Sequence, residues 1–121
     1  MEAMRLPQKS LEEKDIRAQA MLNGLKQAVA VPFDTAKSSY EVIEIAKLVA
    51  QYGNPNSITD VGVGAQIAYT GVIGGIYNVL INLKDINDDD FNEKLRRDCE
   101  QLKSNAIKAL AEVTLIVEKK L

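Results

Sequence analysis

The sequence ITDVGVGAQIAYTGVIGGIYNVLINL, residues 58–83, carries the pattern that decides the fold. Small and polar residues recur along it, and just before it, at intervals of three or four, which places them on one face of an α-helix. These residues are Ser57, Asp60, Gly64, Ala68, Gly71, Gly75, Asn78 and Asn82. The other surfaces of the helix are rich in Val, Ile and Leu. The stretch therefore predicts a helix from about Ile58 to Leu83 with one face that is small in its middle and polar at both ends.

The glycines of this face require compensation. The helix holds five glycines from Gly62 to Gly75, three of them on this face, and each costs a helix interior about 1 kcal/mol relative to alanine. Either the backbone of another helix packs very close to them, or a ligand lies against the groove that they leave. The amides of Asn78 and Asn82 have two interpretations as well, because buried amides need hydrogen-bond partners. They bond across a helix interface or they bind a ligand, and the sequence favours neither.

The same stretch is the one candidate for a membrane span, from Val61 to Leu83. It contains Gln66 and Thr70 besides the two asparagines, and it is rich in glycine. A buried helix of a soluble bundle explains this composition better than a membrane helix does.

Upstream, the chain predicts further helices. Ser10 and Glu13 form a capping box, and a helical run follows from there to about Val31. Pro32 breaks or kinks that run, and a second run extends from about Asp34 to Tyr52. Two separate helices and one long kinked helix both fit. The apolar stripes that we expect to be buried are Ile16, Ala20, Leu22, Leu25, Val29 and Val31 in the first run, and Val42, Ile45, Ala46, Val49 and Ala50 in the second.

A turn joins these runs to the central helix. Gly53 is expected to end the preceding helix in a left-handed conformation. The residues Asn54-Pro55-Asn56-Ser57 are typical of a tight turn. Ser57 is the expected N-cap of the next helix, with Asp60 as the acidic residue of its first turn.

The last helix is predicted from Asn87, its expected N-cap, and runs for about thirty residues, or roughly 45 Å. Its apolar stripe comprises Phe91, Leu95, Cys99, Leu102, Ala106, Ala109, Val113, Ile116 and Leu121. So long a helix needs more partners than this chain supplies, which indicates a bundle completed by a second copy. No strand alternation is present, so the predicted fold class is all-α, a bundle of long helices completed by dimerisation.

Composition restricts the function. The 121 residues fit one domain or part of a larger one, and 15 Lys and Arg residues nearly balance 17 Asp and Glu residues. No concentrated basic face for nucleic acid is visible. The absence of histidine removes the commonest general base and metal ligand. The single cysteine, Cys99, excludes an internal disulfide and lies on an apolar stripe as an inert thiol. No signal peptide is recognisable.

Few residues suggest chemistry. The Asn54–Ser57 turn either presents amides to an anion at a helix N-terminus or serves only as a connection. Asp60 is either an acidic first-turn residue that stabilises the start of the helix or a carboxylate that faces a functional site. Asp88, Asp89 and Asp90 lack the ligand spacing of a calcium loop and fit a solvated helix start. No metal site is predicted.

Three separated segments show a resemblance to a known family. Met4-Arg5-Leu6-Pro7 with Glu12-Glu13-Lys14-Asp15, then Gly53-Asn54-Pro55-Asn56-Ser57 with Asp60 and Gly62-Val63, then the run from Asn78 to Ile86 resemble the cyclodeaminase domain of formiminotransferase-cyclodeaminase. Bacterial methenyltetrahydrofolate cyclohydrolases belong to the same family. The resemblance covers about residues 1–98, in the family's order and spacing.

The resemblance implies an all-α, dimer-forming fold and a tetrahydrofolate derivative as substrate, with no metal or redox cofactor. The implied reaction, a lyase step of histidine degradation and one-carbon metabolism, converts 5-formimino-tetrahydrofolate to 5,10-methenyl-tetrahydrofolate and ammonia. A methenyltetrahydrofolate cyclohydrolase is the alternative, and a non-catalytic helical oligomerisation module is the second. The expected location is cytoplasmic, with no membrane partner, and a formiminotransferase domain precedes this domain in some members.

The resemblance also bears on domain boundaries and the site. Family domains begin earlier, with helices that carry a Pro-Gly-Gly-Gly-Ser type loop and, in the animal enzymes, a histidine proposed as catalytic. Residues 1–121 are therefore expected to be the C-terminal part of one such domain. The residues expected near the folate are Asn54, Asn56, Ser57, Asn78 and Asn82, with Asp60 as the candidate proton-transfer group.

Overall fold

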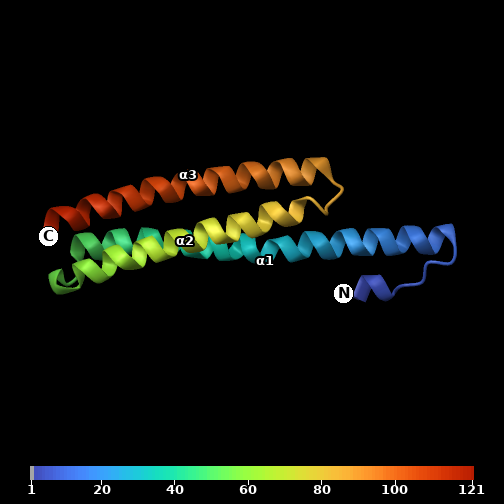
Figure 1. Cartoon of the computed structure of the whole chain (residues 1–121), viewed down its shortest axis with the longest axis horizontal. Helices are drawn as coiled ribbons and strands as arrows, with labels where there is room; N and C mark the ends of the chain where they lie inside the picture. Colours follow the sequence, from blue (N-terminus) through green and yellow to red (C-terminus); the bar gives the residue numbers. More distant parts are fainter. Residues whose placement is uncertain (1) are drawn as a thin grey trace.

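The protein is a bundle of three long antiparallel helices. The computed structural model describes residues 2–121 and contains α1 (Leu11–Tyr52), α2 (Ile58–Leu83) and α3 (Asp89–Lys120), with short 3-10 helices at Glu2–Arg5 and Pro55–Ser57. Figure 1 shows α1 running well past the other two helices, with the N-terminal segment folded back beside its start. Every regular element within the described residues is helical, so the predicted all-α class is confirmed.

Helix α1 is one continuous helix, which settles the question that the sequence left open. The predicted capping box is present, because Ser10 Oγ accepts a hydrogen bond from the Glu13 amide at 3.0 Å. Pro32 lies inside the helix, although a proline removes one helical hydrogen bond and usually costs about 3 kcal/mol. Tertiary packing compensates, since Val29 and Ala36 on either side of Pro32 are fully buried.

The core is a narrow seam with a seven-residue repeat. Helix α1 buries Val29, Ala36, Ile43 and Ala50, and α2 buries Ile58, Ala65, Val72 and Val79. This spacing is typical of helices that pack as in a coiled coil. The stripe predicted for residues 34–52 is largely wrong, because Val42, Ile45 and Val49 are 40–58 % exposed. Ile16 and Val31 of the stripe predicted for the first run are also exposed, at 58 % and 68 %. Three of these eight seam positions are alanine, and the others are valine or isoleucine.

The stripe predicted for α3 is largely confirmed. Cys99, Leu102, Ala106, Ala109 and Val113 are buried against the other two helices. The exception is Leu121, which is exposed beyond the last turn, while Val117 is buried one turn earlier.

The turn between α1 and α2 differs from the expectation in two details. Gly53 has φ −79° and ψ −173°, so it is extended and not left-handed. Ser57 precedes α2 but its side chain makes no capping hydrogen bond. The reason is that Pro55–Ser57 forms a 3-10 turn that leads directly into α2. Asn54 caps this turn instead, with its Oδ1 accepting a hydrogen bond from the Asn56 amide at 2.9 Å.

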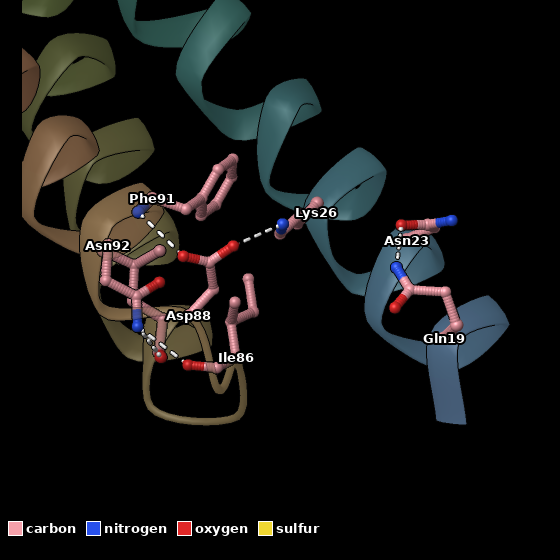
Figure 2. A network of polar contacts seen from close by, with 8 residues as sticks. Gln19, Asn23, Lys26, Ile86, Asp88, Phe91 and Asn92 are labelled. Atoms are coloured by element: carbon pink, nitrogen blue, oxygen red, sulfur yellow. Dashed lines mark hydrogen bonds and ion pairs between the residues drawn. The ribbon is translucent and has the colours of Figure 1, made fainter. Parts of the chain in front are cut away.

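The corner between α2 and α3 is held by a polar network around Asp88 (Figure 2). Asp88, not the predicted Asn87, caps α3 and accepts a hydrogen bond from the Phe91 amide at 3.1 Å. Lys26 of α1 donates to the other Asp88 oxygen at 2.6 Å and also lies over the Phe91 ring. The buried Asn92 donates to the carbonyls of Ile86 and Leu83. One network therefore ties the corner to α1.

This network predicts an acid-sensitive contribution to stability. The Lys26 ammonium, and then the Phe91 amide, hold the pKa of Asp88 below its usual range. A carboxyl whose pKa is lower in the folded state stabilises the fold above its unfolded pKa of about 4, and loses that contribution as pH falls through the folded value. Asp88→Asn keeps a capping oxygen but not the charge. Urea denaturation at pH 6 and pH 3 is expected to show a smaller loss of stability on acidification for the variant. Equal losses in both proteins would contradict this assignment.

Among the described residues one helical stretch, Pro55–Leu83, is long and apolar enough to cross a membrane, and it comprises the 3-10 turn and α2. A core helix of a soluble bundle passes the same test. Here α2 packs against both α1 and α3 and buries residues along its whole length. The packing agrees with the preferred interpretation of a bundle helix.

Cys99 is buried on the apolar stripe of α3, as the sequence predicts. Its side chain is buried, and burial together with the nearby Asp98 charge raises its pKa to about 11. Because the thiolate is the reactive form, the folded protein should not react with a thiol reagent at pH 7.5. We expect one thiol to be labelled after addition of denaturant and none before. Rapid labelling of the native protein would show that α3 opens at this point.

Candidate functional site

An open groove lies between α1 and α2 near the middle of the bundle. It has a volume of about 560 Å³. Its lining residues come from facing turns of the two helices: Ala28, Val31, Pro32, Thr35, Gly71, Gly74, Gly75, Asn78 and Asn82. The small face predicted for residues 58–83 thus supplies one wall of this groove, and the turns around Pro32 supply the other.

Close packing of two backbones forms the floor of the groove. A Cβ atom on Gly75 would lie 2.6 Å from the Pro32 carbonyl oxygen and 2.8 Å from the Ala36 Cβ. A Cβ on Gly71 would lie 2.5 Å from the Ser39 Oγ. The first of the two explanations for the glycines, a helix backbone packed very close, is therefore confirmed at Gly75, whereas Gly71 faces the side chain of Ser39. It does not apply to Gly64 and Gly74, where a Cβ would meet nothing within 4 Å.

Pro32 adds a polar group to the α1 wall. Having no amide hydrogen, it cannot donate the regular helical hydrogen bond to the carbonyl of Ala28, one turn earlier. Ala28 itself lines the groove. The neighbouring Thr35 hydroxyl donates to the Val31 carbonyl at 3.2 Å, and its oxygen can still accept a hydrogen bond. The groove thus offers a main-chain acceptor and a hydroxyl on its α1 side.

The two asparagines supply the polar groups of the α2 wall. Both side chains are exposed, and neither bonds to another helix within residues 2–121. The Asn82 Nδ2 donates to the Asn78 carbonyl at 2.7 Å, which fixes the orientation of that amide. Within residues 2–121 the Asn82 side-chain oxygen and the Asn78 side-chain amide make no hydrogen bond. These contacts exclude the interpretation that the two amides hydrogen-bond across a helix interface within one chain.

The other predicted site residues lie at the far end of α2. Asn54, Asn56, Ser57 and Asp60 are at the turn between α1 and α2. Asp60 is eighteen residues from Asn78, which corresponds to about 27 Å along the helix at 1.5 Å per residue. The structure therefore does not bring the two groups together within one chain.

The groove can bind and orient a ligand but holds no proton-transfer group of its own. None of its lining residues is titratable. It can pair with a flat, polar heterocycle through amide, hydroxyl and carbonyl groups over an apolar floor. Across the part of the chain described, no group of three or more His, Cys, Asp or Glu side chains gathers in a way that would hold a metal ion.

Sequence reasoning missed the α1 half of this groove. Ala28, Val31, Pro32 and Thr35 were not expected near a site, because Pro32 was interpreted only as a helix breaker. The sequence signal that could have identified this half was Pro32 itself. A proline inside a continuous helix leaves the carbonyl one turn earlier without its helical hydrogen bond.

Fold and groove together define an all-helical domain with an amide-bearing cleft between two closely packed helices. A profile described as formiminotransferase-cyclodeaminase matches residues 1–101. The chain belongs to this family.

Individual relatives agree with this assignment. The chain is 45 % identical over 94 residues to formimidoyltransferase-cyclodeaminase of Mus musculus, an alignment that covers 78 % of this chain and 17 % of that protein. It is 38 % identical over 106 residues to methenyltetrahydrofolate cyclohydrolase of Methylorubrum extorquens, covering 88 % and 51 %. The crystal structure of formiminotetrahydrofolate cyclodeaminase from Thermotoga maritima superposes with a TM-score of 0.79 at 25 % identity, over 97 % of this chain and 56 % of that one.

These alignments also show how much of each relative's length the chain covers. The chain spans about half of the cyclohydrolase and of the Thermotoga protein, and less than a fifth of the mouse protein. The names of these relatives place the family among enzymes that convert folates.

Proposed function

We propose that this chain forms part of a folate-dependent cyclodeaminase, and that the groove between α1 and α2 binds the tetrahydrofolate substrate. One observation carries the proposal: the Asn78 and Asn82 amides lie within the stretch that matches the family, and they line the groove beside the backbone acceptor freed by Pro32. The family supports a folate as the ligand.

The reaction suits a groove that positions a ligand. In 5-formimino-tetrahydrofolate the substrate's own N10 attacks the formimino carbon, forming the second carbon–nitrogen bond of the ring. The N10 proton and one further proton reach the former imino nitrogen, whose bond to the carbon breaks as it departs as ammonia and leaves the 5,10-methenyl-tetrahydrofolate cation. Holding N10 against that carbon is the main requirement, since both reacting atoms belong to one molecule. Asp60 is our candidate for moving the proton, and Asn54, Asn56 and Ser57 for contacts near it.

The cyclohydrolase is a second candidate, because the Methylorubrum relative carries that name and aligns over 88 % of this chain. In that reaction water attacks the carbon of the methenyl bridge. The groove would bind the same folate skeleton in either case. A non-catalytic helical module remains the third candidate, favoured by the lack of a titratable group in the groove.

A pair of assays separates these candidates. The chain is supplied with 5-formimino-tetrahydrofolate while formation of the methenyl product is followed by absorbance, and separately with 5,10-methenyl-tetrahydrofolate while its loss is followed. We expect product formation in the first assay. Activity only in the second would establish the cyclohydrolase.

A longer version that includes the upstream helices of the family provides the comparison. Activity in the long version alone would assign this chain to binding and folding, with acid–base groups upstream. No turnover by either version in either assay would favour the non-catalytic module.

A further inference from the structure

A second cavity lies between α2 and α3, and we call it the α2–α3 cleft. It has a volume of about 410 Å³, within the range of about 300–1,000 Å³ that is usual for small-molecule sites. The α2 residues that line it, such as Ile76 and Leu80, are on the side of the helix opposite to Asn78 and Asn82 of the amide groove. The two cavities are therefore separate and flank the same turns of α2.

The floor and the α2 wall of the cleft are apolar. Ile76 and Cys99 line it with only 3 % and 2 % of their surface exposed. Ile73 and Leu80 extend this apolar surface along α2. No side-chain amide lines the cleft, and its one uncharged polar side chain is Tyr77. The cleft therefore suits an elongated hydrocarbon body and offers little to a heterocycle that needs several hydrogen bonds.

Three cations surround this apolar surface. They are Lys84, the C-cap residue of α2, and Arg96 and Lys103 of α3. None of the three takes part in an ion pair within residues 2–121. The one carboxylate in the lining is Glu100, so the lining carries three positive charges against one negative charge. This excess favours an anionic ligand.

Pairing along the helix does not account for the cations of α3. The neighbouring Lys94 and Arg97 each bond to an acid one turn away, at 2.7 Å and 2.9 Å. Glu100 lies four residues after Arg96, a spacing that also permits such a pair, yet the two form none. The charge of Arg96 is thus left at the mouth of an apolar cleft, where a bound anion can pair with it.

The cations differ in their position along the cleft. The Asn92 side chain donates to the Leu83 carbonyl at 3.3 Å, which fixes the register of the antiparallel helices. Counted from this contact, Arg96 is about 6 Å along α3 and Leu80 about 5 Å along α2, so they are nearly level. Lys103 is about 10 Å further on.

The two ends of the cleft therefore have different chemistry. At the end nearer the corner, Lys84 and Arg96 come from two different elements with no acid between them in the lining. At the other end Glu100 is one helical turn from Lys103 and offsets its charge. The corner end is the better place for an anion, and the remaining length of about 10 Å is lined by hydrocarbon.

We propose that the α2–α3 cleft binds a medium-chain carboxylate. Its carboxylate lies between Lys84 and Arg96, which supply charge-assisted hydrogen bonds. Its alkyl chain runs from Leu80 toward Ile73 over the buried floor, and the apolar area that it covers drives binding. The site does not depend on the proposed folate function, because it lies on the other side of α2.

Ligand class is tested with two probes that share a chain but differ in charge. The protein, labelled with nitrogen-15, is titrated with decanoate and, separately, with decyltrimethylammonium. We expect saturable shifts with decanoate at the backbone amides of residues 73–84 and 96–103, and no saturation with the cation. Equal binding of both probes, or no saturable binding of decanoate, would overturn the proposal.

The role of the cations is tested with Arg96→Gln. The loss of a charge-assisted contact is expected to raise the dissociation constant for decanoate about tenfold. Arg97→Gln is the matched control, since Arg97 is an exposed neighbour that pairs with Glu93 and does not line the cleft. Its affinity should equal that of the wild type. Unchanged helical circular dichroism shows that both variants fold, and equal affinities of the two variants would overturn the assignment of the carboxylate to Arg96.

Competition tests whether the cleft is separate from the folate groove. Decanoate binding is measured with and without saturating tetrahydrofolate. We expect the same dissociation constant in both cases. Displacement of decanoate by tetrahydrofolate would make the cleft part of a folate site and overturn the proposal. Absence of tetrahydrofolate binding, with decanoate still bound, would refute the proposed function and leave the cleft proposal standing.

Discussion

Replacing Gly75 with alanine is expected to lower the free energy of unfolding by about 1–3 kcal/mol, the usual cost of overpacking a well-packed core. The new Cβ would lie 2.6 Å from the Pro32 carbonyl oxygen and 3.0 Å from the Ala36 amide nitrogen. Both are backbone atoms of α1, so the whole helix must move to relieve the contact. The loss is expected although alanine improves helix propensity by about 1 kcal/mol.

Gly64→Ala is the matched control for this prediction. Gly64 lies in the interior of the same helix, and a Cβ there would meet nothing within 4 Å. Only the propensity gain applies, so this variant should be more stable by up to about 1 kcal/mol. Urea denaturation of both variants at low protein concentration checks the opposite signs. Stabilisation by Gly75→Ala would show that α1 and α2 do not pack as closely as the structure describes.

Replacing Asn78 with leucine is expected to weaken tetrahydrofolate binding about tenfold to a hundredfold. A lost hydrogen bond that leaves a ligand group unpaired costs about 1–3 kcal/mol. The side chain is exposed and bonds to no other helix within residues 2–121. Thermal stability should therefore change little. Isothermal titration calorimetry and thermal denaturation of the same samples measure the two quantities.

Asn105→Leu tests whether any exposed asparagine gives the same effect. Asn105 is an exposed residue of α3 that accepts a hydrogen bond from Gln101. This variant should bind tetrahydrofolate as the wild type does. A large loss of stability in Asn78→Leu with unchanged affinity would show that Asn78 has a structural role and would remove it from the site.

The helices were predictable from the sequence because their signals are local. The Ser10 cap, the 3-4 spacing of residues 57–82 and the stripe of α3 depend on neighbours within a turn or two. Burial in residues 34–52 was not predictable in the same way. Helix α1 presents apolar residues on two faces, and hydrophobicity alone selected Val42, Ile45 and Val49, which are exposed. Close approach of the helices places Ala36 and Ala50 in the seam instead.

The candidate site was predictable in part. The pattern of residues 58–83 identified a small face with amides at one end, and the structure places a groove there. It could not identify the opposite wall, because the alignment of Ala28 to Thr35 with Gly71 to Asn82 arises only from tertiary packing. The assignment of Asp60 and the Asn54–Ser57 turn to the folate stays a prediction, since one chain holds them apart from the groove.

The most direct test of the account is to locate the folate on the protein. The chain, labelled with nitrogen-15, is titrated with tetrahydrofolate while its amide resonances are followed. We expect the largest shifts at the backbone amides of Gly71, Gly74 and Gly75 and at the side-chain amides of Asn78 and Asn82. Shifts confined to the cleft between α2 and α3 beside Lys84, Arg96 and Lys103, or no shifts at saturating ligand, would contradict the assignment of the α1–α2 groove as the folate site.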